Sequence, residues 1–374
     1  MKTKPSLWLM VVMLMFPQIV ETIYSPALGS IAQSFAVSYA QAAQTLSIYF
    51  SAFAVGVVVW GVLADKWGRR PTMLLGLFIY GGAALVAMKA DNFTTVMLAR
   101  AVSAFGIAVG SVVTQTMLRD VFRGEELAKV FSLMGMGISI SPVLGMLLGG
   151  QLSQAGGYQY VFLALFVMAL GLFVYNLVQL PETQQQKQPL QLCSLSGRMI
   201  KDVKIWQSAV LVALYNVALF SYYQLGAFRF AELGFNAQQF GYSGIVLGLG
   251  TLVGSYVNKA MLSRSFSHRT LLGVAALLLA VGSIAVFAML DSIWFVAPMM
   301  FVVMSFGIAI PNVLSVALTD YKQQAGSAGA VFGLMYYLMI GGGLGLAGII
   351  QDLGTVLIGC SVLTMIVTMR GKKH

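Results

Sequence analysis

The chain has 374 residues, of which 59% are hydrophobic and 9% charged, and its formal net charge is +10 at pH 7. Soluble domains are usually about 25% charged. Together with a mean hydropathy of +0.85, this composition excludes a soluble globular protein, because water could not solvate so much apolar surface.

A membrane-spanning helix needs about 20 mostly apolar residues. Twelve such segments follow one another along the chain, so we predict an all-α membrane protein with twelve transmembrane helices. The predicted spans cover residues 7–28, 43–64, 72–89, 93–117, 129–151, 159–180, 206–228, 239–260, 270–290, 293–317, 326–350 and 353–369. Lys2 and Lys4 precede the first apolar segment as they would in a signal peptide, but that segment continues to Leu28, and we expect an uncleaved helix.

The basic residues mark one face of the membrane. With the N-terminus placed inside, all of the 22 Lys and Arg except Lys89, Arg229 and Arg100 fall in loops or ends on that side. This distribution follows the positive-inside rule. It predicts two cytoplasmic termini in a bacterial inner membrane, and it explains the net charge without a nucleic-acid partner.

One long polar stretch, rich in Gln and basic residues, separates the first six spans from the last six. We therefore predict an N-terminal bundle (1–180), a cytoplasmic linker (181–205) and a C-terminal bundle (206–374). A weak repeat supports two related halves, since Gly61-x-x-x-Asp65-Lys66 recurs as Gly254-x-x-x-Asn258-Lys259. Transporters built from parallel repeats place their site between the halves, near the middle of the membrane.

Motifs for enzymatic chemistry are missing from the sequence. It has no Gly-rich phosphate loop followed by Lys-Ser/Thr and no His-Glu-x-x-His. Its only histidines, His268 and His374, and its only cysteines, Cys193 and Cys360, fall in no metal-binding or disulfide spacing. We expect no enzyme activity, no cofactor and no metal, so transport would depend on an ion gradient or run downhill.

The charged turn after the second span carries a resemblance to a known family. Gly61-x-Leu63-Ala64-Asp65-x-x-Gly68-Arg69-Arg70 resembles the loop 2–3 signature of the major facilitator superfamily. The run from Gln44 to Pro71, "ETIYSPALGSIAQSF" from Glu21, the run from Arg119 to Gly150 and "LPET" before the linker resemble drug/proton antiporters of the Bcr/CflA and EmrD type. The resemblance is dense over residues 1–183 and thin afterwards.

Three positions depart from this family pattern. The acid of the first helix is Glu21, where the family often has an Asp at the position of Thr22. Tyr158-Gln159 replaces a Trp-Arg after the fifth helix, and Gly145-Met146 replaces an Ala-Pro within it. The first departure affects the identity of the proton site and the last affects the bend of helix 5.

The resemblance implies a conformational gate at this turn, made of Gly61, Asp65, Gly68, Arg69 and Arg70. The chemistry of the residues fits: the two glycines permit close approach and positive φ, and the Asp65 carboxylate suits the positive end of another helix or a neighbouring Arg. The arginines suit anionic lipid headgroups. The resemblance implies that Asp65 joins the two halves in the outward-facing state, by contacting the start of helix 11 near Ala325. Simple topology anchors would explain the arginines but neither the acid nor the glycines.

Two charges lie deep in spans, and such residues are candidates for function. Glu21 is about 21 Å along the first helix, and Arg100 about 10 Å from the opposite entrance of the fourth, in a core of about 30 Å. The depths match, so the two side chains could pair or compete for a proton and a substrate. We predict that they couple proton movement to transport. The alternative is a static salt bridge that fixes helix packing.

Aromatic and polar residues near these charges predict a cavity for amphipathic ligands. The predicted substrate-binding residues are Tyr24, Tyr49, Ser111, Gln115, Tyr215, Asn216, Tyr223 and Tyr336. Tyr222 and Tyr223 could instead belong to an interfacial belt. In the fifth helix, Pro142 removes a backbone hydrogen bond and should kink the helix. The resemblance implies that this helix lies at the hinge between the halves, with Pro142, Gly145 and Gly149 as the expected hinge residues.

These features predict a proton-coupled antiporter that exports small amphipathic compounds, with a role in multidrug efflux and antibiotic resistance. We expect a monomer whose partners are a small-molecule substrate, protons and membrane lipids. An exporter dedicated to one metabolite, such as a siderophore or an amino acid, would need the same residues. A membrane receptor without transport activity would have no use for the loop motif or the matched charges.

Overall fold

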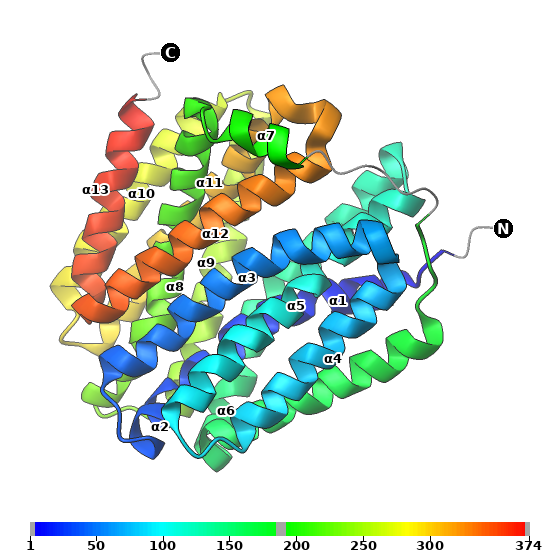
Figure 1. Ribbon diagram of the computed structural model, residues 1–374. Helices are drawn as coiled ribbons and strands as arrows, with labels where there is room; N and C mark the ends of the chain where they lie inside the picture. Colours follow the sequence, from blue (N-terminus) through cyan, green and yellow to red (C-terminus); the bar gives the residue numbers. More distant parts are fainter. Residues whose placement is uncertain (1–3, 185–191, 371–374) are drawn as a thin grey trace.

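The structure, a computed structural model, describes residues 4–184 and 192–370, and within these ranges it is helical with no strand (Figure 1). The helices of the first half are α1 (Leu7–Ile23), η1 (Ser25–Ala27), α2 (Leu28–Ser34), α3 (Tyr39–Trp67), α4 (Arg69–Met88), α5 (Phe93–Val121) and α6 (Gly124–Gln179). They are followed by α7 (Leu192–Met199), α8 (Val203–Glu232), α9 (Ala237–Ser263), α10 (His268–Met289), η2 (Ile293–Phe295), α11 (Val296–Ala317), η3 (Thr319–Gln324), α12 (Ala325–Ile350) and α13 (Leu353–Arg370).

The fold class predicted from the sequence is confirmed, with two pseudo-symmetric halves of membrane-spanning helices. In the described residues, ten helices are long and apolar enough to cross a membrane, and the apolar helix Leu353–Met369 is slightly shorter. The long helix α6 contains two of these spans, because its backbone leaves the helical region at Gly156 and Gly157. Gly157 has φ +64°, a value that glycine adopts without steric cost. The last two spans are divided at Gln351, which has φ +56°.

The first span differs from the continuous helix expected over residues 7–28. Helix α1 ends at Ile23, and the chain passes through the short 3-10 helix η1 before α2 resumes the span. Pro26 lies in η1. Its ring removes a backbone donor and disfavours α geometry in the preceding turn. Tyr24 therefore lies at the end of α1, where the backbone turns.

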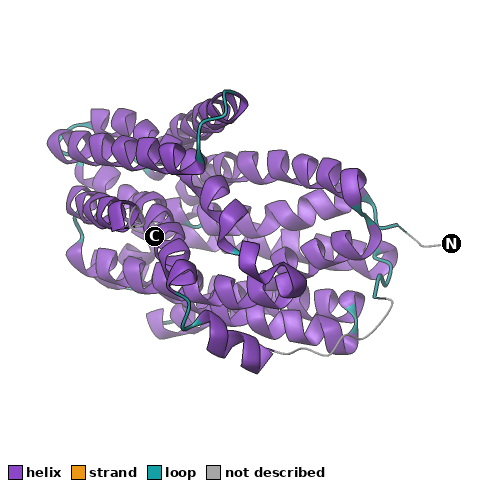
Figure 2. Ribbon diagram, turned by 90° about the horizontal axis from the view of Figure 1, so that it is seen from above, coloured by secondary structure: helices purple, strands orange, loops and turns teal. Residues whose placement is uncertain are grey.

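The first residues of α1 and the last residues of α13 lie on one face of the bundle, which we call the termini face (Figure 1). The opposite face, here the hairpin face, carries the α4–α5 and α10–α11 connections (Figure 1). Seen from above, the described part consists of helices joined by short loops (Figure 2). Arg229, an exception to the predicted charge pattern, lies on the hairpin face and pairs with Glu232 at 2.8 Å and Asp291 at 2.7 Å. Lys187 lies outside the described residues.

The region predicted as a linker contains α7 at its centre. Leu195 and Met199 of α7 are buried, and the helix packs against α12 at the termini face (Figure 1). The division of the chain into bundles at residues 180 and 206 stays a prediction. The side chain of Cys193 lies outside the described part, and Cys360 is a free, buried thiol.

Hydrogen bonds join the two halves along α3 and α12, which run side by side (Figure 1). Gln44 donates to the Gly345 carbonyl at 3.0 Å, and Ser47 donates to the Gly341 carbonyl at 2.6 Å. Gln224 of α8 is fully buried, and its Nε2 donates to the carbonyls of Ala43 and Leu344 at 2.8 and 2.9 Å. All three donors lie in the parts of these helices nearer to the hairpin face, so in this state the halves are held together there.

On the other side of the interface, α6 lies between α1 and α9. A Cβ added at Gly145 or Gly149 would overlap Thr22 or the Ile23 carbonyl of α1. The adjoining face of α6 meets the second half, where a Cβ at Gly150 would lie 3.0 Å from the Cα of Gly241. Small residues let helix backbones approach closely in membranes. Helix α6 therefore belongs to both interfaces, which is the position a hinge requires.

The unusual Gly145-Met146 pair is accommodated by this packing. Met146 is fully buried. A Cβ added at Gly241 would lie 2.6 Å from the Met146 carbonyl, and one at Gly244 would lie 2.6 Å from the Met146 Cβ. The glycines of α9 thus provide the space that the larger side chain occupies.

Candidate proton and substrate site

Arg100 is held between tyrosine rings inside the first half. Its guanidinium carbon lies 3.9 Å from the ring centroid of Tyr24 and 4.4 Å from that of Tyr49. The residue is 1% exposed, and none of its three guanidinium nitrogens has a hydrogen-bond partner in the part of the chain that the structure describes. Cation–π attraction, which strengthens when the cation is desolvated, is therefore the main direct contact of this charge.

Glu21 is the only buried carboxylate among the described residues, at 4% exposed. It interacts electrostatically with Arg100, yet the two side chains form no hydrogen bond, since the guanidinium bonds to nothing. The static salt bridge considered from the sequence is therefore not formed in this state. The acid and the base are near neighbours that remain apart.

The groups that face Glu21 come from both halves of the molecule. Besides Arg100, its electrostatic neighbours are the tyrosines Tyr49, Tyr223, Tyr336 and Tyr337. They lie on α3, α8 and α12, so residues of both halves are within electrostatic reach of this carboxyl, at the boundary between the halves. A group at that boundary can change its surroundings when the halves move relative to each other.

Aromatic rings connect the halves beside this carboxyl. Tyr337 packs on Phe53 with centroids 4.9 Å apart, and Phe50 packs on Phe220 at 4.6 Å. Tyr336 lies 4.5 Å from Tyr337. Aromatic side chains therefore gather at this boundary, and they include Phe50 and Phe53, which the sequence analysis did not name. That they line a substrate cavity stays a prediction. Phe53 lies one turn from Tyr49 on the same helix and Phe50 directly follows it, and these positions were the available signal.

Other residues predicted to bind substrate are not brought to Arg100. Ser111 and Gln115 are half-buried on α5, about 16 and 22 Å from Arg100 along the helix axis. Asn216 uses its amide on the Val212 carbonyl at 2.8 Å. Tyr215 is buried, and its hydroxyl has no hydrogen-bond partner. These side chains belong to the part of the helices nearer to the termini face.

Two tyrosines at the hairpin end of α8 are both buried. Tyr222 donates to the Ser243 hydroxyl at 2.6 Å and packs against Phe240, inside the second half. Tyr223 is 3% exposed and faces Glu21. Membership in an interfacial belt, the alternative left open by the sequence, is wrong for both residues.

The charged turn of the first half forms a closed ionic network, which we call the loop cluster (Asp65, Arg69, Asp120 and Glu182). Arg69 is 6% exposed. It donates to Asp65 at 2.5 Å and to Asp120 of α5 at 2.9 Å. The ends of three helices, α3, α4 and α5, are therefore tied to one guanidinium.

Glu182 attaches the start of the linker to the same turn. Its carboxylate accepts from the backbone N–H groups of Arg69 and Arg70, at 3.0 Å each. These donors lie at the N-terminus of α4, where a negative charge is favourable. Gly68 has φ +107°, and a Cβ there would lie 2.6 Å from a Glu182 oxygen, so both the turn and the bound carboxylate require glycine.

The loop cluster corrects two expectations. Arg69 is not a lipid anchor, because carboxylates surround a buried guanidinium and leave it no contact with headgroups. Gly61 permits no unusual approach, since a Cβ there would make ordinary contact with Val112 at 3.8 Å. Asp65 bonds to Arg69 and, through its backbone carbonyl, to Gln184 at 2.6 Å. The side chain of Ala325, at the start of α12 (the eleventh predicted span), lies outside the described residues. The predicted contact between Asp65 and the start of this helix therefore stays a prediction.

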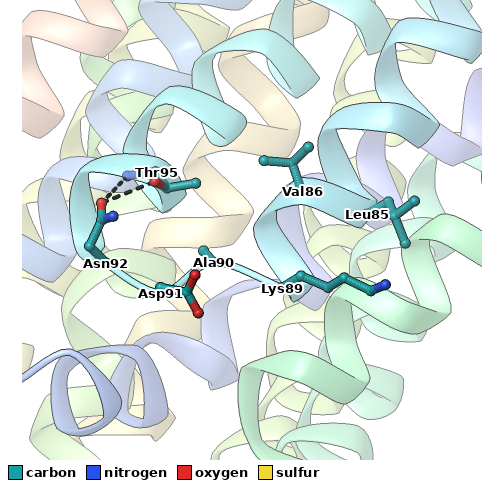
Figure 3. A pocket seen from close by; sticks show the side chains of 7 residues that line it. All are labelled: Leu85, Val86, Lys89, Ala90, Asp91, Asn92 and Thr95. Atoms are coloured by element: carbon teal, nitrogen blue, oxygen red, sulfur yellow. Dashed lines mark hydrogen bonds between the residues drawn. The ribbon is translucent and has the colours of Figure 1, made fainter.

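A small pocket of about 330 Å³ lies on the hairpin face, lined by the turn between α4 and α5 (Figure 3). Asn92 caps α5 there by accepting from the Thr95 backbone N–H at 2.9 Å, while Lys89 extends away from Asp91 (Figure 3). No residue of the proton and substrate site lines this pocket, and we assign it no role.

A bundle of twelve apolar helices, with a buried acid facing the boundary between its halves, defines a multi-pass membrane transporter. The chain belongs to the Major Facilitator Superfamily, whose family model matches residues 8–346. The resemblance read from the sequence is thereby confirmed. Members of this family are transporters and not enzymes, and they are embedded in membranes and carry small molecules.

Curated relatives include transporters named for drug resistance. The chain is 29% identical to an uncharacterized transporter of Rickettsia bellii over 89% of this chain and 87% of that one. It is 25% identical to a bicyclomycin resistance protein homolog of Haemophilus influenzae over 85% and 82% of the two chains. It is also 32% identical to multidrug resistance protein D of Escherichia coli, over 49% and 47% of the two chains.

Solved structures of the same fold include a D-xylose-proton symporter, with a TM-score of 0.72 and 14% identity over 96% of each chain. A bacterial homolog of the human lysosomal transporter Spinster, in an inward-facing and occupied conformation, has a TM-score of 0.73 and 15% identity. That match covers 97% of this chain and 94% of the other. At these identities, the likeness concerns the fold alone.

Proposed function

We propose that this protein is a proton-coupled antiporter that exports small amphipathic compounds, drugs among them, across the inner membrane of a bacterium. The observation that carries the proposal is Glu21, the only buried carboxylate among the described residues, which faces aromatic groups of both halves. The drug-resistance names of the relatives support the substrate class. The basic residues gathered at the termini face support cytoplasmic termini.

The chemistry follows from two opposing effects on the Glu21 carboxyl. Burial disfavours the ionised form, and the nearby charge of Arg100 favours it. A conformational change that alters either the exposure of Glu21 or its separation from Arg100 changes its proton occupancy. Proton uptake on one side of the membrane and release on the other can then drive the return step of an exporter.

The substrate occupies the aromatic boundary beside Glu21 in this scheme. Tyr223 and Tyr336 approach it from the second half, while Tyr24 and Tyr49 act at Arg100. Apolar walls with few polar groups accept ligands of varied shape. Ser111, Gln115, Tyr215 and Asn216 lie farther toward the termini face, so they would contact a substrate entering from that side.

The moving parts are assigned from their contacts between helices. Gly145 and Gly149 give α6 its close packing against α1 while its other face meets α9. Pro142 lies in the same stretch of α6, and we propose this segment as the hinge. Asp65 and the loop cluster are proposed to stabilise the outward-facing state from the termini face. The polar contacts of Gln44, Ser47 and Gln224 close the hairpin face in the opposite state.

The test combines proton release with efflux. Purified wild-type protein and Glu21→Gln are titrated in detergent with candidate drugs at several pH values, and released protons are measured. We expect release from the wild type and none from Glu21→Gln. Equal release from both proteins would move the coupling acid elsewhere. A growth and efflux panel of drugs and native metabolites in a pump-deleted host then separates a broad exporter from one dedicated to a single metabolite.

A further inference from the structure

We propose that Tyr24 and Tyr49 are positioning residues that clamp Arg100 away from Glu21, and that this separation is what leaves Glu21 free to exchange its proton. The inference deepens the proposed function and rests on Glu21 as the coupling acid. It changes the role that the sequence suggested for these two tyrosines, from contacts with the substrate to contacts with the arginine.

The geometry of the two rings is the first support. Arg100 lies over both ring faces, at 3.9 and 4.4 Å from their centroids. The rings come from different helices, Tyr24 from the end of α1 and Tyr49 from α3. A long, flexible side chain that contacts one ring could leave it easily. Contact with two rings on separate helices restricts the guanidinium to one place.

The rings are also unavailable to a ligand. Tyr24 and Tyr49 are each 0% exposed, and their hydroxyl groups are buried, that of Tyr24 beside the Thr45 side chain. A substrate-binding tyrosine would offer a ring face or its hydroxyl to the ligand. Here Arg100 covers a face of each ring, and the remaining surface is packed inside the first half.

The alternative partner of Arg100 explains why a clamp is needed. A buried guanidinium without hydrogen bonds is costly, and a carboxylate satisfies it better than any neutral group because their hydrogen bonds are charge-assisted. Glu21 is within electrostatic reach. Released from the rings, Arg100 would pair with Glu21 and hold it ionised, and an acid locked in that form could no longer carry protons.

The titration of Glu21 depends on the charged and titratable groups around Glu21 and Arg100. Arg100 faces Glu21, Tyr24, Tyr49 and Tyr80. Glu21 faces, in addition to Arg100, the tyrosines Tyr49, Tyr223, Tyr336 and Tyr337. The tyrosines are neutral across the pH range of transport, so Arg100 and Glu21 are the charges whose separation the clamp controls.

The experiment titrates Glu21 directly, without substrate or transport. Infrared difference spectra of the full chain in detergent follow the protonated carboxyl band against pH, and Glu21→Gln assigns the band. Tyr24→Phe and Tyr49→Phe keep the rings and should keep the wild-type midpoint. Tyr24→Leu and Tyr49→Leu remove them, and the midpoint should fall by about one pH unit or more, as expected when a carboxyl gains an ion pair.

Two controls make the result specific. Tyr222→Leu removes a buried ring of the second half that does not touch Arg100 and should leave the midpoint unchanged. Combining Arg100→Ala with either leucine variant should abolish the shift that the leucine variant causes. If a leucine variant does not fold, methionine, which fills irregular core space well, replaces it at the same position.

Transport kinetics give a second readout. Loss of the clamp should lower turnover at least tenfold with KM nearly unchanged, and the phenylalanine variants should restore turnover. Folded leucine or methionine variants that keep the wild-type midpoint would overturn the clamp, and so would a raised KM with normal turnover, which would indicate substrate contacts. If the carboxyl band persists in Glu21→Gln, the assignment of the coupling acid fails instead, so the two failures are distinguishable.

Discussion

Replacement of Arg69 tests the loop cluster most directly, because the structure reverses the outcome that the sequence suggested. An arginine that only anchors the chain to lipid could become lysine at little cost. In the structure, the Arg69 side chain donates from Nη1 to Asp65 and from Nε to Asp120. Lysine has one nitrogen on an unbranched stem and cannot reproduce this fork. We therefore expect Arg69→Lys to be damaging, and Arg69→Ala more so.

The size of the effect follows from the exposure of the three side chains. The side chain of Arg69 alone is 8% exposed, and the side chains of its partners Asp65 and Asp120 are 26% and 22% exposed, so the pairs are partly shielded from water. Hydrogen bonds to charged groups contribute about 1.5–3 kcal/mol each, and breaking a fully buried pair costs about 3–5 kcal/mol. We expect Arg69→Ala to cost about 2–4 kcal/mol, because Thr183 still donates to Asp120. Arg69→Lys, which keeps one contact, should cost about half as much.

Thermal unfolding in detergent measures this difference. Cys360 is buried, so a fluorogenic thiol reagent reports unfolding once Cys193 has been replaced. A unit of the size of one half loses about 2–4 °C of Tm per kcal/mol, so Arg69→Ala should melt on the order of 10 °C lower. The matched control is Arg70→Ala, next in the chain, which loses a bond from Nη2 to the Leu177 carbonyl but no ion pair. Equal melting of Arg69→Lys and wild type, or equal losses for the two alanine variants, would refute the ionic account.

Three further expectations concern the site and the interface. Arg100→Ala removes the positive neighbour of Glu21, which then keeps its proton to higher pH, so the pH profile of efflux should move upward; an unmoved profile would exclude their coupling. Gln224→Leu removes the hydrogen bonds to the Ala43 and Leu344 carbonyls, so the hairpin face should open more often and cysteines placed there should react faster with a thiol reagent. Unchanged labelling would show that packing alone closes this face. Gly150→Val should cost about 1–3 kcal/mol by overpacking against α9, visible as a lower Tm, and a wild-type Tm would contradict the close contact.

The number of spans could be predicted from the sequence because lipid demands long apolar helices, and their ends are marked by charge and turn residues. The break inside α6 was readable in the same way, since Gly156 and Gly157 interrupt one apolar run. The break after Ile23 was not predicted, although Pro26 was visible. A proline near the end of a span can bend, end or merely start a helix, and neighbouring helices decide between these outcomes.

The candidate site was predictable in its charges but not in their contacts. Glu21 and Arg100 could be identified because any deep charge in lipid is exceptional. Their separation could not be, because it depends on where the rings of Tyr24 and Tyr49 lie in space. The partners of Arg69 were equally hidden, since Asp120 and Glu182 are 51 and 113 residues away along the chain. Hydropathy and motif spacing contain no information on such distances.

The second half shows which part of the loop cluster can be built without a carboxylate. At the place that corresponds to Asp65, Asn258 accepts from Asn312 of α11 at 2.6 Å, and Asn312 bonds in turn to His268 of α10 at 2.7 Å. This chain ties the ends of α9, α10 and α11 with amide and imidazole groups alone.

An amide at the end of the second helix of a half can therefore hold three helix ends together, so Asp65→Asn should keep the fold. Its oxygen still accepts from Arg69, and Asp120 still pairs with that guanidinium. What the substitution removes is the negative charge, which the proposed gate needs to meet the start of α12. We expect Asp65→Asn to insert and melt nearly as the wild type does while its efflux falls strongly, whereas Asp65→Leu should lose both. Normal efflux by Asp65→Asn at equal expression would reduce the acid to a structural tie, with no part in gating.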